Sequence, residues 1–144
     1  MKKIAFLLGI CLSILSCNST EKKPLKNTKE TALVMYKFSE MALLMEDMYL
    51  ANEKLKEKIL KQEDLGSFPE KFINIHTAVL TDVNDRTASF EVFSKALITN
   101  QKAIYSSSTD SVKNQFNTMV NTCVACHETT CSGPIPRIKK LLIP

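Results

Sequence analysis

The stretch Cys123-Val124-Ala125-Cys126-His127 carries the residues of this chain that are best suited to chemistry. Two thiols separated by two residues and followed at once by a histidine form the C-x-x-C-H pattern, which is typical of covalent haem attachment. The thiols add to the two vinyl groups of haem as thioethers, and the histidine binds the iron as an axial ligand. On a helix, positions 123, 126 and 127 lie three and four residues apart, so their side chains share one face. The sequence therefore predicts one covalently bound haem c.

Two other interpretations of these residues stay open. One is a reactive or disulfide-bonded cysteine pair, although a thioredoxin-like C-x-x-C stands near a βαβ pattern, which this sequence lacks. The other is a zinc site in which Cys131 joins Cys123, Cys126 and His127 as a fourth ligand. Adjacent ligands such as Cys126 and His127 differ from the spaced pairs that structural zinc sites use. Haem attachment is therefore the interpretation we favour.

The start of the chain predicts export from the cytoplasm. Lys2 and Lys3 give a positive beginning, and residues 4–15 form a mostly apolar run that is too short to span a bilayer. The run ends in Ile14-Leu15-Ser16-Cys17, which resembles a bacterial lipobox, where an aliphatic and a small residue precede a lipidated cysteine. We expect residues 1–16 to be a signal peptide and Cys17 to carry the lipid. Cleavage nearby that leaves Cys17 unmodified is the alternative.

The five cysteines of the chain fit this scheme. Cys11 leaves with the signal peptide, Cys17 takes the lipid, and Cys123 and Cys126 take the haem. Only Cys131 remains, so it has no partner for an intramolecular disulfide. The sequence leaves the role of this last cysteine open.

Residues 17–29 are predicted to be a lipidated N-terminus and a flexible tether, because residues 18–29 are polar and charged. Without Lys2 and Lys3 the chain has 17 basic and 15 acidic residues, a balance that disfavours nucleic acid as a partner. No second apolar run is long enough to span a bilayer, so membrane contact is expected through Cys17 alone. Asn18 follows Cys17 with no acidic run, which favours a periplasm-facing anchor in the outer membrane over one in the inner membrane.

From residue 30 onward, apolar residues recur every three or four positions, which is the period of amphipathic helices. Helices are predicted over residues 29–62, 69–80, 86–106 and 110–128. Their apolar stripes are, in chain order, Val34, Phe38, Met41, Met45, Met48, Leu55 and Ile59; Phe72, Ile75, His76 and Val79; Phe90, Phe93, Leu97 and Ile104; and Val112, Phe116, Met119, Cys123 and Cys126 with His127.

The segments between these helices carry breaking and capping signals. Ser67 and Glu70 form a capping-box pattern for the second helix. A loop is expected over residues 81–85, the end of helical order at residues 133–136, and a basic and apolar tail over residues 137–144. No alternating strand pattern is present. The sequence therefore predicts an all-α domain over residues 30–144, a four-helix bundle with haem attached to its C-terminal helix.

A four-helix bundle with C-x-x-C-H on its last helix resembles the class II c-type cytochromes, the cytochrome c-prime and cytochrome c-556 type. Class I cytochromes place the motif near the N-terminus of the domain, whereas Cys123 lies close to the C-terminus here. The run from Cys131 to Lys140 departs from the simple end that the family gives its last helix. Together with the lipobox, the resemblance leads us to expect a bacterial lipoprotein form of this group, and it also implies that a homodimer can form.

In this family the first helix supplies the residue on the distal side of the iron, and a methionine there makes an electron carrier. Met45 is our candidate for the distal ligand, with Met41 and Met48 as alternatives on the same stripe. His76 from the second helix is a further alternative, as is an open sixth position. Methionines at helical spacing also serve as core filling.

The sequence leads to a functional hypothesis and two alternatives. We expect a membrane-tethered monohaem cytochrome that transfers single electrons to periplasmic or membrane redox partners and is not an enzyme. Arg137, Lys139 and Lys140 are candidates to pair with the haem propionates, or they form a solvated basic tail. The alternatives are a five-coordinate haem protein that binds small gases or peroxide, with peroxidase-like activity, and a zinc-stabilised helical interaction lipoprotein.

Overall fold

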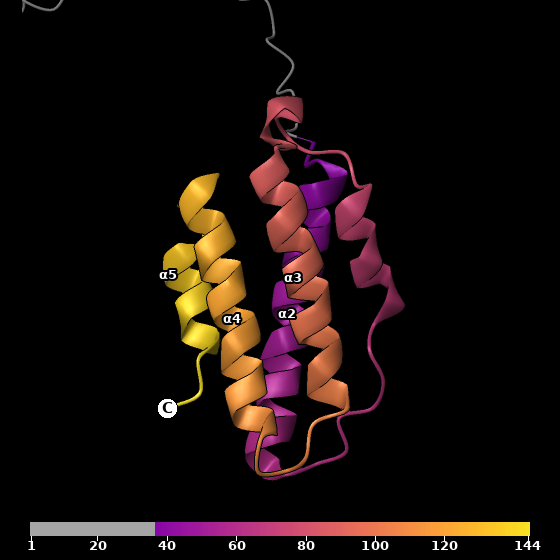
Figure 1. Ribbon diagram of the computed structural model, residues 1–144, viewed down its shortest axis with the longest axis vertical. Helices are drawn as coiled ribbons and strands as arrows, with labels where there is room; N and C mark the ends of the chain where they lie inside the picture. Colours follow the sequence, from indigo (N-terminus) through magenta and orange to yellow (C-terminus); the bar gives the residue numbers. More distant parts are fainter. Residues whose placement is uncertain (1–36) are drawn as a thin grey trace, which may run out of the picture. The chain divides into compact units, whose positions relative to one another are not determined.

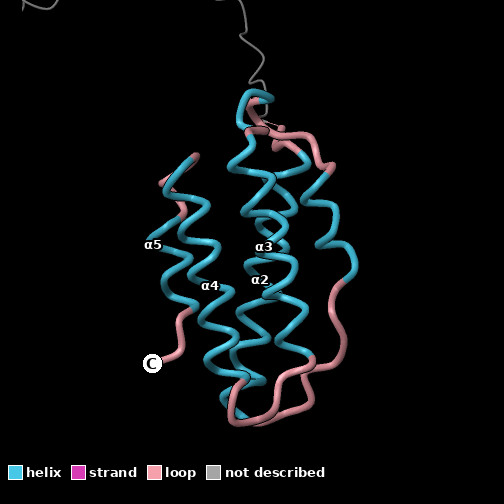
Figure 2. The backbone as a smooth tube through the Cα atoms, viewed as in Figure 1, coloured by secondary structure: helices cyan, strands magenta, loops and turns pink. Residues whose placement is uncertain are grey.

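The structure, a computed structural model, describes residues 37–144. The predicted signal peptide, Cys17, the tether and the first residues of the predicted first helix lie outside the described residues. Within residues 37–144 the secondary structure is helical and contains no strand, as Figure 2 shows. The predicted all-α class is therefore confirmed for this part of the chain.

Three long helices form the frame: α2 (Glu40–Lys61), α3 (Ala88–Tyr105) and α4 (Val112–Thr129). The most extensive packing joins α3 and α4, which run in opposite directions side by side (Figure 1). The core consists mainly of residues from these three helices, and four of them are almost completely buried: Ile104, Phe116, Met119 and Val120. No helix of the described part has the length and apolar character needed to cross a membrane.

Helix α2 begins later than the predicted first helix. Ser39 is its N-cap, and the Ser39 hydroxyl accepts a hydrogen bond from the Ala42 backbone N–H at 3.1 Å. Residues 37–39 are not helical, so the prediction of a helix over 29–62 is wrong there. Phe38, which the prediction placed on the apolar stripe, is 60% exposed. Met41, Met48, Leu55 and Ile59 of the same stripe are buried.

The second predicted helix, over residues 69–80, takes a different form. The chain makes a 3-10 helix, η1 (Glu70–His76), which packs against both α2 and α3. The predicted capping box is wrong, because the N-cap is Pro69 and no side chain caps the helix. Phe72 and Ile75 are buried; their spacing of three matches the three-residue turn of a 3-10 helix. The predicted stripe residue Val79 lies beyond η1 and is 56% exposed.

The connection to α3 contains a short 3-10 turn, η2 (Val83–Asp85), where the sequence predicted a loop. Thr87 caps α3 by accepting a hydrogen bond from the Phe90 backbone N–H at 3.1 Å. The bounds of α3 and α4 agree with the predicted helices over 86–106 and 110–128 to within two residues. Both helices bury most of the residues of their predicted stripes, although Phe93, Cys123, Cys126 and His127 are only half-buried.

The C-terminal segment is folded, so the prediction of a tail is wrong. It contains α5 (Ile135–Ile138) and η3 (Lys139–Leu141), and it buries Ile138, Leu141 and Ile143. Proline at the first helical positions is compatible with a helix start, because its missing N–H needs no partner there. The segment packs against α4, and η3 also contacts α2. Figure 1 shows α5 beside α4 on the side away from α3.

Hydrogen bonds from α2 and α4 hold this segment in place. The Lys56 ammonium donates to the carbonyl oxygens of Lys140 and Leu142 at 2.8 and 2.9 Å. The Asn117 amide bonds the backbone of Ile143 in both directions, donating at 2.8 Å and accepting at 2.9 Å. The C-terminal segment is thus an integral part of the described domain.

Candidate haem-attachment site

A cavity of about 380 Å³ lies between α2, α3, α4 and the C-terminal segment. Its volume falls within the range of pockets that bind small molecules and cofactors. Most of its lining is apolar, including Met41, Met45, Met48, Ile75, Leu80, Phe90, Phe93, Leu97, Ile138 and Leu141. The cavity is therefore a candidate site for a large apolar group.

Cys123, Cys126 and His127 all line this cavity from the last turns of α4. Burial raises the pKa of the Cys123 thiol to about 12, and its S–H points to the sulfur of Met119 at 3.8 Å. Burial also raises the pKa of Cys126, and nearby Cys131 raises it further. Both thiols are therefore protonated near neutral pH.

Within residues 37–144, the hydrogen-bond partners of the His127 imidazole meet its Nδ1 nitrogen. Its Nδ1 lies 3.0 Å from the backbone carbonyl oxygen of Cys131, and the Cys131 sulfur lies 3.2 Å from the same nitrogen. Because a carbonyl oxygen only accepts, this contact requires the proton on Nδ1. Nε2 then keeps its lone pair, as a neutral histidine ligand needs. A backbone acceptor of this kind also orients metal-bound histidines.

The methionines of α2 line the cavity together. Met41 and Met48 are 6% and 5% exposed and belong to the core, whereas Met45 is half-buried. A thioether that is not enclosed by the core has surface left to meet a group in the cavity. Burial is thus the feature that distinguishes Met45 from Met41 and Met48.

Arg137 lines the cavity and is held by α2. Its guanidinium makes two hydrogen bonds to the Glu46 carboxylate, at 2.5 and 2.8 Å, and lies 3.7 Å from the centre of the Tyr49 ring. These hydrogen bonds lower the pKa of Glu46. Lys139 and Lys140, which were predicted together with Arg137 as candidates to pair with the haem propionates, do not line the cavity. Sequence reasoning identified Arg137 but missed its two partners, which lie in α2 far away along the chain.

Three buried polar residues carried no sequence signal, and two of them, Asn52 and Ser94, line the cavity. Asn52 of α2 and Gln101 of α3 bond each other's side-chain amides in both directions, at 3.2 and 2.9 Å. Ser94 of α3 is 2% exposed, and its hydroxyl lies 3.3 Å from Nδ1 of His76. His76 itself is half-buried in η1 and does not line the cavity. The His76 ring therefore lies next to Ser94 and outside the cavity.

The zinc alternative has no assembled ligand set in the described residues. No group of three or more histidine, cysteine, aspartate or glutamate residues between positions 37 and 144 is arranged to hold a metal ion. Cys131 is exposed, and its sulfur lies near Nδ1 of His127. The four residues named for zinc are thus neighbours without forming a tetrahedral site.

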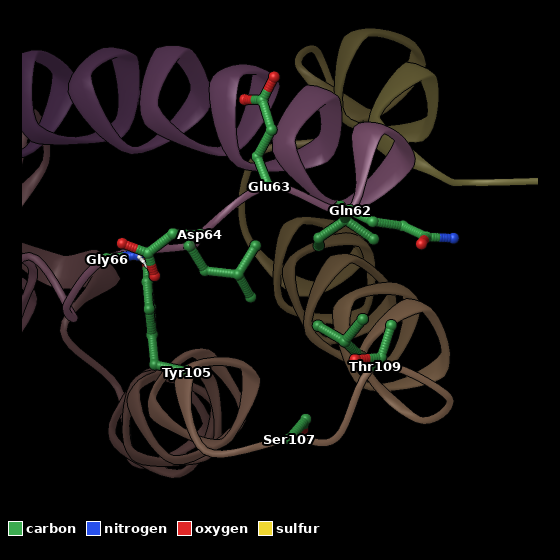
Figure 3. Close-up of a pocket in the computed structure, with 10 residues that line it drawn as sticks. Gln62, Glu63, Asp64, Gly66, Tyr105, Ser107 and Thr109 are labelled. Carbon is green, nitrogen blue, oxygen red and sulfur yellow. Dashed lines mark hydrogen bonds between the residues drawn. The ribbon is translucent and has the colours of Figure 1, made fainter.

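A second cavity, of about 250 Å³, lies at the other end of the helices (Figure 3). Glu63, Asp64 and Gly66 line it after α2, and Ser107 and Thr109 line it between α3 and α4. Gly66 adopts a φ of 76°, and its N–H donates to the Asp64 carboxylate at 3.1 Å. This cavity is more polar, and none of its lining residues belongs to the C-x-x-C-H motif or to the methionine stripe.

Comparisons with known proteins give no relative for this chain. No protein-family model, no curated protein and no solved structure matches it. The functional argument therefore depends on the residues and the geometry of the chain itself.

Proposed function

We propose that this protein binds one haem covalently through Cys123, Cys126 and His127 and serves as an electron carrier. The observation that carries the proposal is the joint position of these three residues in the wall of one apolar cavity. The requirement is specific, because two thioethers and an axial nitrogen must reach one flat group from a single helix face. The donor set and the apolar lining fit this group.

The roles of the chain's residues follow from their chemistry. Cys123 and Cys126 hold the group, and His127 offers Nε2 while Cys131 holds Nδ1 through its carbonyl oxygen. Met45 would be the distal ligand, and Phe90, Phe93 and Leu97 would supply apolar surface to the group from α3. When bound, the haem supplies a one-electron couple whose potential depends on its axial ligands and its burial. In this role the protein transfers electrons and does not convert a substrate.

The family assignment is part of the proposal. We propose that α2, η1, α3 and α4 correspond to the four helices of a class II cytochrome, with haem on the last of them. In place of a regular second helix the chain has η1, and in place of a simple end it has the packed C-terminal segment. Lipidation at Cys17, cleavage after residue 16 and a location on the periplasmic side of the outer membrane complete the proposal, with periplasmic or membrane redox partners.

Haem staining on a denaturing gel tests the proposal. The protein is expressed in a host that matures c-type cytochromes, beside a Cys123→Ala, Cys126→Ala double variant and a Cys131→Ala control. We expect stain on the wild type and on the control, and none on the double variant. A wild-type band without stain, from protein that was expressed and exported, would overturn the proposal.

A further inference from the structure

We propose that His76, held against the cavity wall by Ser94, takes up a proton when the protein accepts an electron. This inference rests on the proposed function, because the charge that drives it is the electron held in the cavity. His76 and His127 are the two histidines of the whole sequence. His76 is therefore the one imidazole that is free of the proposed attachment.

The hydrogen bonds around Ser94 define the state of the His76 ring. The Ser94 hydroxyl has one hydrogen, which it donates to the backbone carbonyl of Glu91 at 3.2 Å. Its oxygen lies 3.3 Å from Nδ1 of His76, so it accepts the Nδ1 hydrogen of that ring. The neutral ring then carries its proton on Nδ1, and Nε2 is the nitrogen that can take up another.

Ser94 connects this ring to the cavity. It is 2% exposed and lines the cavity from α3, whereas His76 is half-buried and keeps part of its surface towards solvent. A hydroxyl that is enclosed in an apolar wall is costly unless it is bonded. The two hydrogen bonds of the Ser94 hydroxyl hold the ionisable His76 ring on the outer side of the cavity wall.

Charged groups from the neighbouring elements keep this ring in place. The Arg86 guanidinium donates to the carbonyl oxygens of His76 and Ala78 at 2.8 and 2.7 Å. The Glu91 carboxylate lies 3.8 Å from Arg86, so part of that cation's field is compensated. From α2, the Glu40 carboxylate accepts from the Val79 N–H at 3.0 Å, close to the same turn. The backbone of His76 is thus anchored, and the orientation of its ring depends on Ser94.

The coupled step adds one electron and one proton to the protein. An external one-electron reductant supplies the electron, and water supplies the proton to Nε2 of His76, so no covalent bond between heavy atoms forms or breaks. An added negative charge in a cavity of low dielectric constant attracts a positive charge at the wall more strongly than it would in water. The proton is therefore bound more tightly in the reduced protein than in the oxidised one.

A redox titration at a series of pH values tests this coupling in the intact haem-loaded protein. We expect the midpoint potential to fall as the pH rises through the range in which imidazoles ordinarily titrate, near about pH 6.5. His76→Asn should abolish this fall. Ser94→Ala should reduce it, because the ring can then turn away from the wall. Thr99→Ala is the matched control, since Thr99 makes a similar bond to a carbonyl of α3 but is exposed.

A second readout follows the ring itself. Nuclear magnetic resonance at one fixed pH should show the His76 ring carrying more of the added proton in the reduced protein than in the oxidised protein. An unchanged pH dependence in His76→Asn would overturn the inference and assign the proton to carboxyl groups such as the propionates. A potential independent of pH would overturn it while leaving the electron-carrier proposal intact. Absence of haem absorbance would instead overturn the proposed function itself. Should His76→Asn not fold, His76→Gln takes its place.

Discussion

The Nδ1 nitrogen of His127 lies 3.0 Å from the backbone carbonyl oxygen of Cys131, four residues further along the chain. The contact is made just beyond Thr130, the C-cap of α4, where the chain turns towards α5. The end of the helix therefore defines the tautomer of the proposed axial ligand. The acceptor is a backbone atom, so it does not depend on the nature of the side chain at position 131.

Cys131→Ser should therefore leave haem attachment intact. The substitution keeps the carbonyl that accepts the His127 proton and replaces only the sulfur. Haem stain and the absorbance spectrum of the purified variant check this, with His127→Ala as the comparison that should disturb the spectrum. Loss of stain in Cys131→Ser would show that the thiol of Cys131 takes part in attachment.

Met45→Ala should open the sixth iron position. In our account Met45 is the distal ligand, so its removal should let carbon monoxide bind to the reduced protein much more readily than to the wild type. Met41→Ala and Met48→Ala are matched controls from the same cavity wall and should bind carbon monoxide as little as the wild type does. Free binding of carbon monoxide by the wild type would favour a five-coordinate protein.

The three cysteines of the described part should differ in reactivity when haem is absent. Cys131 is exposed, whereas burial raises the pKa of Cys123 to about 12. Since the thiolate is the nucleophile, Cys123 has almost none of it near pH 8. Alkylation followed by peptide mass spectrometry should find Cys131 modified first and Cys123 last, and all rates should rise with pH. Faster modification of Cys123 than of Cys131 would contradict the packing described for α4.

Leu141→Ala should destabilise the domain although it lies close to the C-terminus. Leu141 is 4% exposed, and removing a buried leucine side chain costs about 2–5 kcal/mol. Chemical denaturation should measure this loss, with the exposed neighbour Lys140→Ala close to the wild type. An unchanged free energy of unfolding in Leu141→Ala would mean that the C-terminal segment is not packed in solution.

Local sequence patterns were sufficient to predict α4, which carries the motif, and its neighbour α3. The apolar stripes of α3 and α4 predict the ends of these helices to within two residues, and the two helices pack against each other. The same patterns brought Cys123, Cys126 and His127 to one wall. Helical periodicity is a local property, so these predictions needed no knowledge of distant contacts.

The remaining features depend on contacts between distant residues. The apolar residues of the segment over 69–80 have a spacing that is compatible with an α-helix or with a 3-10 helix. In the structure this segment forms the 3-10 helix η1 and packs against α2 and α3, which are distant in the sequence. The C-terminal prolines looked like a stop, yet they begin α5, whose Arg137 pairs with Glu46 of α2. The carbonyl group that orients His127 belongs to the backbone, so no residue type in the sequence could have indicated it. No local pattern encodes such pairings.

The most direct test of the central claim is the mass of the C-x-x-C-H peptide. Trypsin cleaves after Lys113 and Arg137, so one peptide from Asn114 to Arg137 contains the whole motif. From protein made with c-type haem maturation, we expect this peptide to carry the added mass of one haem under denaturing conditions. The same peptide without added mass, or with its cysteines only free or oxidised, would contradict the account.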